Sequence, residues 1–84
     1  MGHPWRVENE FLVCYDYGMG GLWGILIAES AAAITAEYPE LVLVHERPTW
    51  MTDERYADLR GAPLWLGDDP PQGLLRAVVA DRDK

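Results

Sequence analysis

The sequence has little of the chemistry on which most cofactor and metal sites depend. It contains one cysteine, Cys14, two histidines and a single serine in 84 residues. One cysteine excludes an internal disulfide framework and every multi-cysteine zinc or iron-sulfur motif. Because Cys14 lies inside an apolar run, we interpret it as a small buried hydrophobe rather than as a nucleophile.

The remaining candidate groups do not complete a known motif. His45 is followed by Glu46, but the second histidine of an H-E-x-x-H site is missing, and no D-x-D-x-D-G calcium loop occurs. Ser30 precedes a helical pattern and reads as a cap, and no G-x-S-x-G elbow is present. The sequence therefore predicts no metal, cofactor or catalytic residue. A small enzyme or ligand-binding protein that uses Asp16 and His45 stays open as an alternative.

Basic residues are scarce as well. Seven bases stand against 14 acids, which gives a formal charge of −7, and the imbalance is concentrated in the first half of the chain. Residues 1–42 hold six acids and one base (−5), and residues 43–84 hold eight acids and six bases (−2). Because nucleic-acid affinity depends on neutralising phosphates, we expect no direct nucleic-acid partner. A protein partner with a basic surface fits this charge better.

Long hydrophobic runs are also missing. No apolar run approaches the roughly 18 residues needed to span a bilayer, and the N-terminal residues show no apolar signal core. We expect a cytoplasmic protein with no membrane partner. The hydrophobic content of 49% and the four tryptophans indicate a folded chain. We predict one domain over residues 1–84, with residues 1–8 and 82–84 frayed.

The first half of the chain is typical of a β-hairpin followed by a crossover. Residues 11–17 and 22–28 are rich in strand formers, and the glycine-rich link between them predicts a tight turn. That link leads into another strand and not into a helix, which argues against a phosphate-binding loop. Ser30 caps a predicted helix that ends before Pro39, and residues 41–45 predict a strand covered on both faces. A right-handed crossover would set this third strand parallel to the second.

The second half predicts one or two packing helices. Thr52 is a favourable cap for the first of them, and residues 62–67 read as an extended or irregular segment. Asp69 as cap and Pro70 at the first helical position introduce the second helix, whose LLRAVV run also permits a strand. The predicted fold class is α+β: a small single domain of β-β-α-β order, followed by one or two packing helices.

The aromatic residues of the hairpin are its most informative feature. Alternation places Tyr15 and Tyr17 on one face of the first strand, and Trp23 shares a face of the second strand with Ile25. Both faces of the hairpin are apolar. The alanine-rich helix can cover one, and the other needs the C-terminal helix, the Trp65 segment or another chain. These aromatics are therefore either core or interface residues.

For function, we predict a non-enzymatic protein-binding module. It would be a small acidic accessory or inhibitor protein, of the immunity, antitoxin or phage-inhibitor kind, that docks through the hairpin. The alternative is a homodimeric structural domain that buries the same face against itself. The predicted partner-binding residues are Tyr15, Asp16, Tyr17 and Trp23, with Glu8 and Glu10 adding negative charge.

Overall fold

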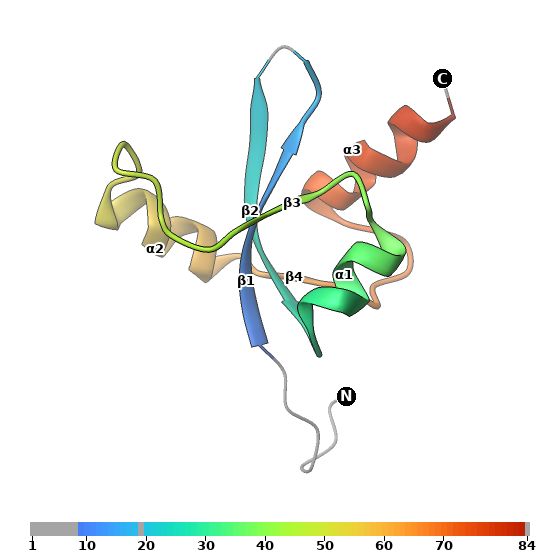
Figure 1. Cartoon of the computed structure of the whole chain (residues 1–84), viewed down its shortest axis with the longest axis horizontal. Coiled ribbons are helices and arrows are strands. Elements are labelled where there is room, and N and C mark those ends of the chain that lie inside the picture. Colours follow the sequence, from blue (N-terminus) through green and yellow to red (C-terminus); the bar gives the residue numbers. More distant parts are fainter. Residues whose placement is uncertain (1–8, 19, 84) are drawn as a thin grey trace.

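The computed structural model describes residues 9–18 and 20–83, and it confirms the α+β class. The described residues form one four-stranded sheet and three helices (Figure 1). In chain order the elements are β1 (Asn9–Asp16), β2 (Gly21–Ala28), α1 (Ala31–Glu37), β3 (Val42–Val44), α2 (Asp53–Gly61), β4 (Leu64–Trp65) and α3 (Gly73–Arg82). The predicted fraying of residues 1–8 and 84 lies outside the described residues, and the fraying of residues 82–83 stays a prediction.

The sheet is built on the predicted hairpin. Its strand order is β3-β1-β2-β4, with β1 antiparallel to both β2 and β3. Strand β3 therefore runs parallel to β2, as the crossover predicts, but it pairs with β1 instead of lying beside β2. It is an edge strand. Leu43 and Val44 pack against hydrophobic cores on opposite faces of the sheet, as predicted, whereas Val42 is 54% exposed. Leu64 and Trp65, within the segment predicted to be extended or irregular, form β4 parallel to β2 on the opposite edge.

The helix starts follow local capping chemistry at α1 and α2. The Ser30 and Thr52 hydroxyl oxygens accept hydrogen bonds from the Ala33 and Arg55 amides, each at 3.1 Å. These bonds satisfy amide donors that the first helical turn leaves unpaired.

The start of α3 differs from the prediction. The helix begins at Gly73 with Gln72 in the cap position, and not at Pro70 behind an Asp69 cap. A proline disfavours helical angles in the residue before it, so Pro71 prevents Pro70 from opening the helix.

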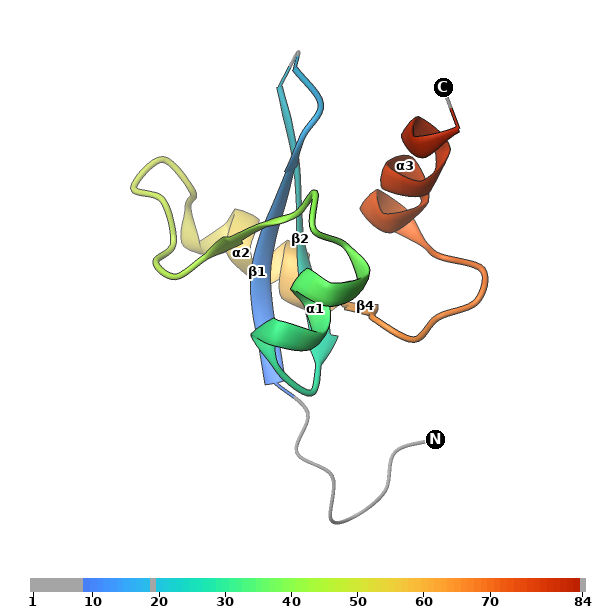
Figure 2. The same cartoon turned by 45° about the vertical axis from the view of Figure 1, so that its right-hand side comes forward.

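The helices enclose the sheet from both sides (Figures 1 and 2). Helices α1 and α3 cover the face that carries Val13, Tyr15 and Leu26, which is the larger hydrophobic core. Helix α2 covers the other face, where Leu12, Ile25 and Met51 form a smaller core. The second face is therefore covered by α2, and not by the C-terminal helix or the Trp65 segment. This three-layer arrangement decides which hairpin residues remain accessible.

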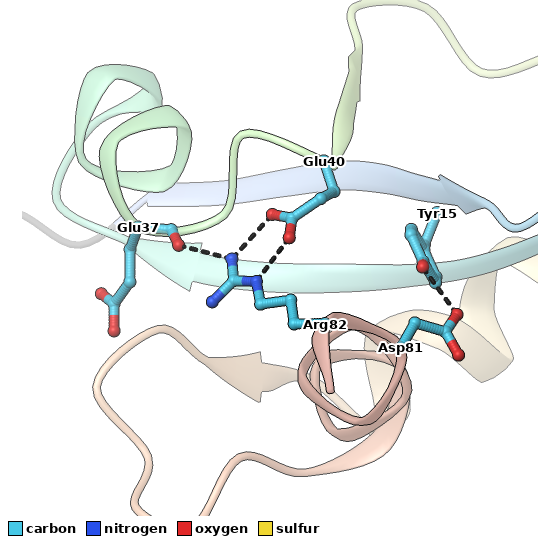
Figure 3. A network of polar contacts seen from close by, with 5 residues as sticks. All are labelled: Tyr15, Glu37, Glu40, Asp81 and Arg82. Atoms are coloured by element: carbon cyan, nitrogen blue, oxygen red, sulfur yellow. Dashed lines mark hydrogen bonds and ion pairs between the residues drawn. The ribbon is translucent and has the colours of Figure 1, made fainter. Parts of the chain in front are cut away.

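Polar contacts hold α3 against the hairpin and α1 (Figure 3). The Tyr15 hydroxyl donates a 2.7 Å hydrogen bond to Asp81 Oδ2. The Arg82 guanidinium forms a two-point ion pair with the Glu40 carboxylate and donates to the Glu37 carbonyl oxygen at 2.9 Å. It also lies 5.2 Å from the centre of the Tyr38 ring. Arg82 therefore joins the last turn of α3 to the end of α1.

Candidate protein-binding surface

The turn of the hairpin is organised by Asp16. Its Oδ1 accepts a 2.8 Å hydrogen bond from the Gly18 amide, and the Tyr17 amide donates to the Gly20 carbonyl oxygen at 3.3 Å. Gly18 and Gly20 have φ values of 92° and 148°, which side-chain-bearing residues rarely adopt. The glycine-rich link is thus a hairpin turn, and Asp16 caps it in the manner of an Asx turn.

The structure separates the three predicted aromatic site residues. Tyr15 is buried under α3, and its hydrogen bond to Asp81 raises the pKa of its hydroxyl. Trp23 pairs with Cys14 across the hairpin, so it projects from the face opposite to that of Tyr15. Tyr17 is 48% exposed beside the turn. The three side chains therefore do not form one continuous surface.

A different set of residues surrounds Trp23 on the α2 side of the sheet. Cys14 of β1 pairs with Trp23 of β2 on one side and with Val42 of β3 on the other. Trp50, from the loop before α2, contacts Trp23 edge to face, with 5.2 Å between the ring centres. We call Cys14, Trp23, Val42 and Trp50 the Trp23 patch.

The patch is an apolar group at the border of the smaller core, against which Trp23 packs. The neighbouring row of Val44, Leu12 and Ile25 packs into the smaller core under Tyr56 and Leu59. The residues of the patch, which lie one row closer to the hairpin turn, are less buried. Trp50 is 60% exposed and Val42 54% exposed, while Cys14 and Trp23 are half-buried. Large apolar side chains gathered on an exposed face are a feature of interaction sites.

Close packing positions the Trp23 indole. A Cβ atom at Gly21 would lie 2.9 Å from Cys14 Sγ and 3.3 Å from Trp23 Nε1, so both side chains lie over this glycine. Burial raises the pKa of the Cys14 thiol, and the negative charge of Asp16 raises it further. The thiol is thus neutral at physiological pH and contributes apolar surface rather than reactivity.

The remaining predicted residues lie elsewhere. Glu10 accepts a 3.1 Å hydrogen bond from Arg60 Nη2, an ion pair that joins β1 to α2. Glu8 lies outside the described residues. Sequence reasoning missed Val42 and Trp50 as surface residues. Trp50 lies between Pro48 and the helix cap, in a segment that the sequence marks as a loop. Because loops run over the surface, this position could have predicted an exposed tryptophan.

His45 lies in a separate pocket of about 240 Å³ at the end of β3. Residues 10–12 of β1, Ala31, residues 43–45, Arg47 and Tyr56 line it. Asp16 is not among them: β3 ends opposite Leu12, and Asp16 lies four residues further along β1, about 13 Å away at the usual strand rise. The structure therefore does not bring Asp16 and His45 into one site.

Comparisons of the chain with protein-family models, with curated protein sequences and with solved structures found no match. Within the described part of the chain, no helix has the length and apolar character that crossing a membrane requires. Among residues 9–18 and 20–83, no three His, Cys, Asp or Glu side chains are grouped so that they could hold a metal ion.

Proposed function

We propose that this protein is a non-enzymatic protein-binding module that docks through the Trp23 patch. The observation that carries the proposal is the partly exposed Trp23 patch on the α2 side of the sheet, in which Trp50 and Val42 are each more than half exposed. Aromatic side chains of this kind supply most of the affinity in protein interfaces. A small acidic accessory or inhibitor protein is the class that fits best.

The net negative charge of the protein indicates which kind of partner it binds. The formal charge of −7 and the exposed Asp16, which follows Cys14 on the same strand face, favour a basic protein surface. The same charge disfavours nucleic acid as a direct partner. It also disfavours a second copy of this chain, because self-association would bring together two molecules of charge −7. A homodimer remains the alternative occupant of the patch.

The test compares two exposed tryptophans. Wild type, Trp50→Ala and Trp65→Ala are used as baits on lysate of the native host, and stoichiometric partners are identified by mass spectrometry. Trp65 is 47% exposed on β4, outside the patch, and serves as the matched control. We expect Trp50→Ala to weaken partner binding by about 30-fold or more, as loss of an aromatic anchor worth about 2 kcal/mol requires. Trp65→Ala should bind as wild type does.

Two further readouts make the test decisive. Circular dichroism should show that Trp50→Ala is folded, because the side chain is mostly exposed. Sedimentation of the purified protein separates the alternative: a wild-type dimer that Trp50→Ala converts to a monomer would replace the partner proposal with self-association. A partner that both alanine variants retain at wild-type affinity would contradict docking through the patch.

A further inference from the structure

The pocket beside His45 occupies the place of a missing strand. Strand β3 ends at Val44, opposite Leu12, whereas β1 begins at Asn9. Within the described residues, no strand pairs with residues 9–11 of β1 on the β3 side. The pocket lies at this gap, and Glu10, Phe11 and Leu12 form one of its walls. We call it the β1-edge slot.

The backbone of Glu10 points into this slot. Glu10 faces Ile27 in the register of β1 and β2, and the Ile27 carbonyl oxygen accepts a 3.1 Å hydrogen bond from the Leu66 amide beyond the other edge of β2. Residues that face each other in an antiparallel pair either exchange both backbone bonds or exchange none. The Glu10 N–H and C=O are therefore directed away from β2, toward the slot. No hydrogen bond from a described residue reaches them there.

The walls of the slot fit an extended chain. Ala31, at the start of α1, lines one side, and Tyr56 of α2 lines the other. In Figures 1 and 2, α1 and α2 lie on opposite sides of the β1 segment below its crossing with β3. At about 240 Å³ the slot is smaller than the roughly 300–1,000 Å³ of typical small-molecule sites. A strand added beside β1 would satisfy the Glu10 backbone and lie between the two helix layers.

The slot is closed at one end by β3, and Arg47 among its lining residues is cationic. Val44 fills the position opposite Leu12, so a chain that enters along Asn9 and Glu10 cannot continue past it. Arg47 also lines the pocket, and its guanidinium lies 5.3 Å from the centre of the Tyr56 ring. Its ion pair with Asp53 spans 2.6 Å, but the Asp53 side chain is 93% exposed. A guanidinium has five donors, so Arg47 retains donors for a second carboxylate.

We propose that the β1-edge slot binds the carboxyl terminus of a partner protein. The last residues of the partner add to β1 as a short strand that pairs with the Glu10 backbone, and the terminal carboxylate pairs with Arg47. This site is separate from the Trp23 patch, because Val44 borders the slot and Val42 lies in the patch, toward the hairpin turn. Loss of one site therefore leaves the other intact.

A peptide library tests the proposal. Immobilised hexapeptides with randomised sequence and a free carboxyl terminus are screened against the full-length protein, beside the same library with amidated termini. We expect a subset of free-carboxylate peptides to bind. Amidation, or the Arg47→Gln substitution, should weaken binding about tenfold or more, because each removes one partner of the charge pair. Arg76→Gln, an equal charge change on an exposed residue of α3, should leave binding unchanged.

Hydrogen exchange of single amides distinguishes peptide binding at β1 from a general change in the stability of the protein. The Glu10 amide should exchange rapidly in the free protein and become protected when a selected peptide binds. The Leu12 amide, which lies in the paired part of β1 and β3, should be protected in both states. Ala31→Leu, which fills the slot, should abolish peptide binding and leave the Leu12 amide protected. The proposal is overturned if no free-carboxylate peptide binds, if amidation has no effect, or if the Glu10 amide is unaffected by the bound peptide.

Discussion

At the scale of single residues, Gly73 determines how α3 can follow β4. Its φ of 55° lies in the left-handed region, and a Cβ atom there would lie 2.9 Å from Leu64 Cδ2. Leu64 belongs to β4 and packs against the larger core. Gly73 thus allows the helix to begin directly against the strand, at an angle that a residue with a side chain adopts only with strain.

We expect Gly73→Ala to lower the free energy of unfolding by about 1–2 kcal/mol, from backbone strain together with the close contact. Gly61→Ala is the matched control: its φ is outside the left-handed region, and a Cβ there meets no atom within 4 Å. That substitution should be neutral or stabilise by up to about 1 kcal/mol, because it restricts the unfolded chain. Urea denaturation of both variants measures the difference. Equal stability of the two would show that Gly73 carries no strain penalty.

At the scale of elements, α3 is fixed by an apolar stripe and by Arg82. Leu74, Leu75 and Val78 are buried against the sheet, and the Arg82–Glu40 ion pair joins the helix end to the segment after α1. The Arg82 guanidinium lowers the pKa of the Glu40 carboxyl to about 2. An unfolded glutamate binds its proton near pH 4.5. The contribution of Glu40 to stability is therefore complete above about pH 5 and disappears as the pH falls toward 2.

This pKa predicts a pH-dependent effect of Glu40→Gln. The variant should unfold at a lower temperature than wild type at pH 7, and the two melting temperatures should converge by pH 2, where wild-type Glu40 is itself losing its charge. Glu29→Gln is the control, because its exposed carboxylate forms no ion pair with a described residue. Thermal unfolding followed by circular dichroism measures all three proteins. If the melting temperatures of wild type and Glu40→Gln differed as much at pH 2 as at pH 7, the result would contradict a stabilising role of the ion pair.

The elements with strong local signals were predictable from sequence. Alternating strand formers and the Ser30 and Thr52 caps each specify one kind of element within a few residues, and the Leu74–Val79 stripe favours a helix without excluding a strand. The cover provided by α2 was not predictable. Few of its residues are apolar, Tyr56 and Leu59 contribute its contacts to the smaller core, and Met51 completes that core from outside the helix. No hydrophobic periodicity marks such a helix.

The candidate site was predictable only in part, because it depends on strand register. A slip of one residue moves every side chain to the other face of a sheet. The glycine-rich turn predicts a hairpin, but it does not specify that Trp23 lies opposite Cys14 and away from Tyr15. Contacts between distant segments, such as Trp50 with Trp23 and Arg60 with Glu10, leave no local pattern. The sequence thus identified Trp23 and Asp16 as surface candidates without the residues that surround them.

At the scale of the whole molecule, charge repulsion opposes the fold. The chain holds 14 acids and seven bases, and the three ion pairs of the described residues engage only three of these acids. We therefore expect added NaCl to raise the melting temperature, since the screening length falls from about 30 Å at 0.01 M to about 3 Å at 1 M salt. A Glu29→Gln/Glu54→Gln variant, with a formal charge of −5 instead of −7, should show a smaller rise.

The same screening acts in the opposite direction on partner binding. The proposed basic partner of the Trp23 patch would be attracted by the same negative charge that destabilises the free chain, so we expect its affinity to fall as the salt concentration rises. Melting curves and binding isotherms recorded over one salt series measure both responses on the same protein. A melting temperature that rises with salt and an affinity that falls with salt would support a long-range effect of the net charge on both stability and binding. A melting temperature that falls with salt would instead show that the Arg82–Glu40 pair and its neighbours outweigh the general repulsion, and the charge argument for a basic partner would lose its basis.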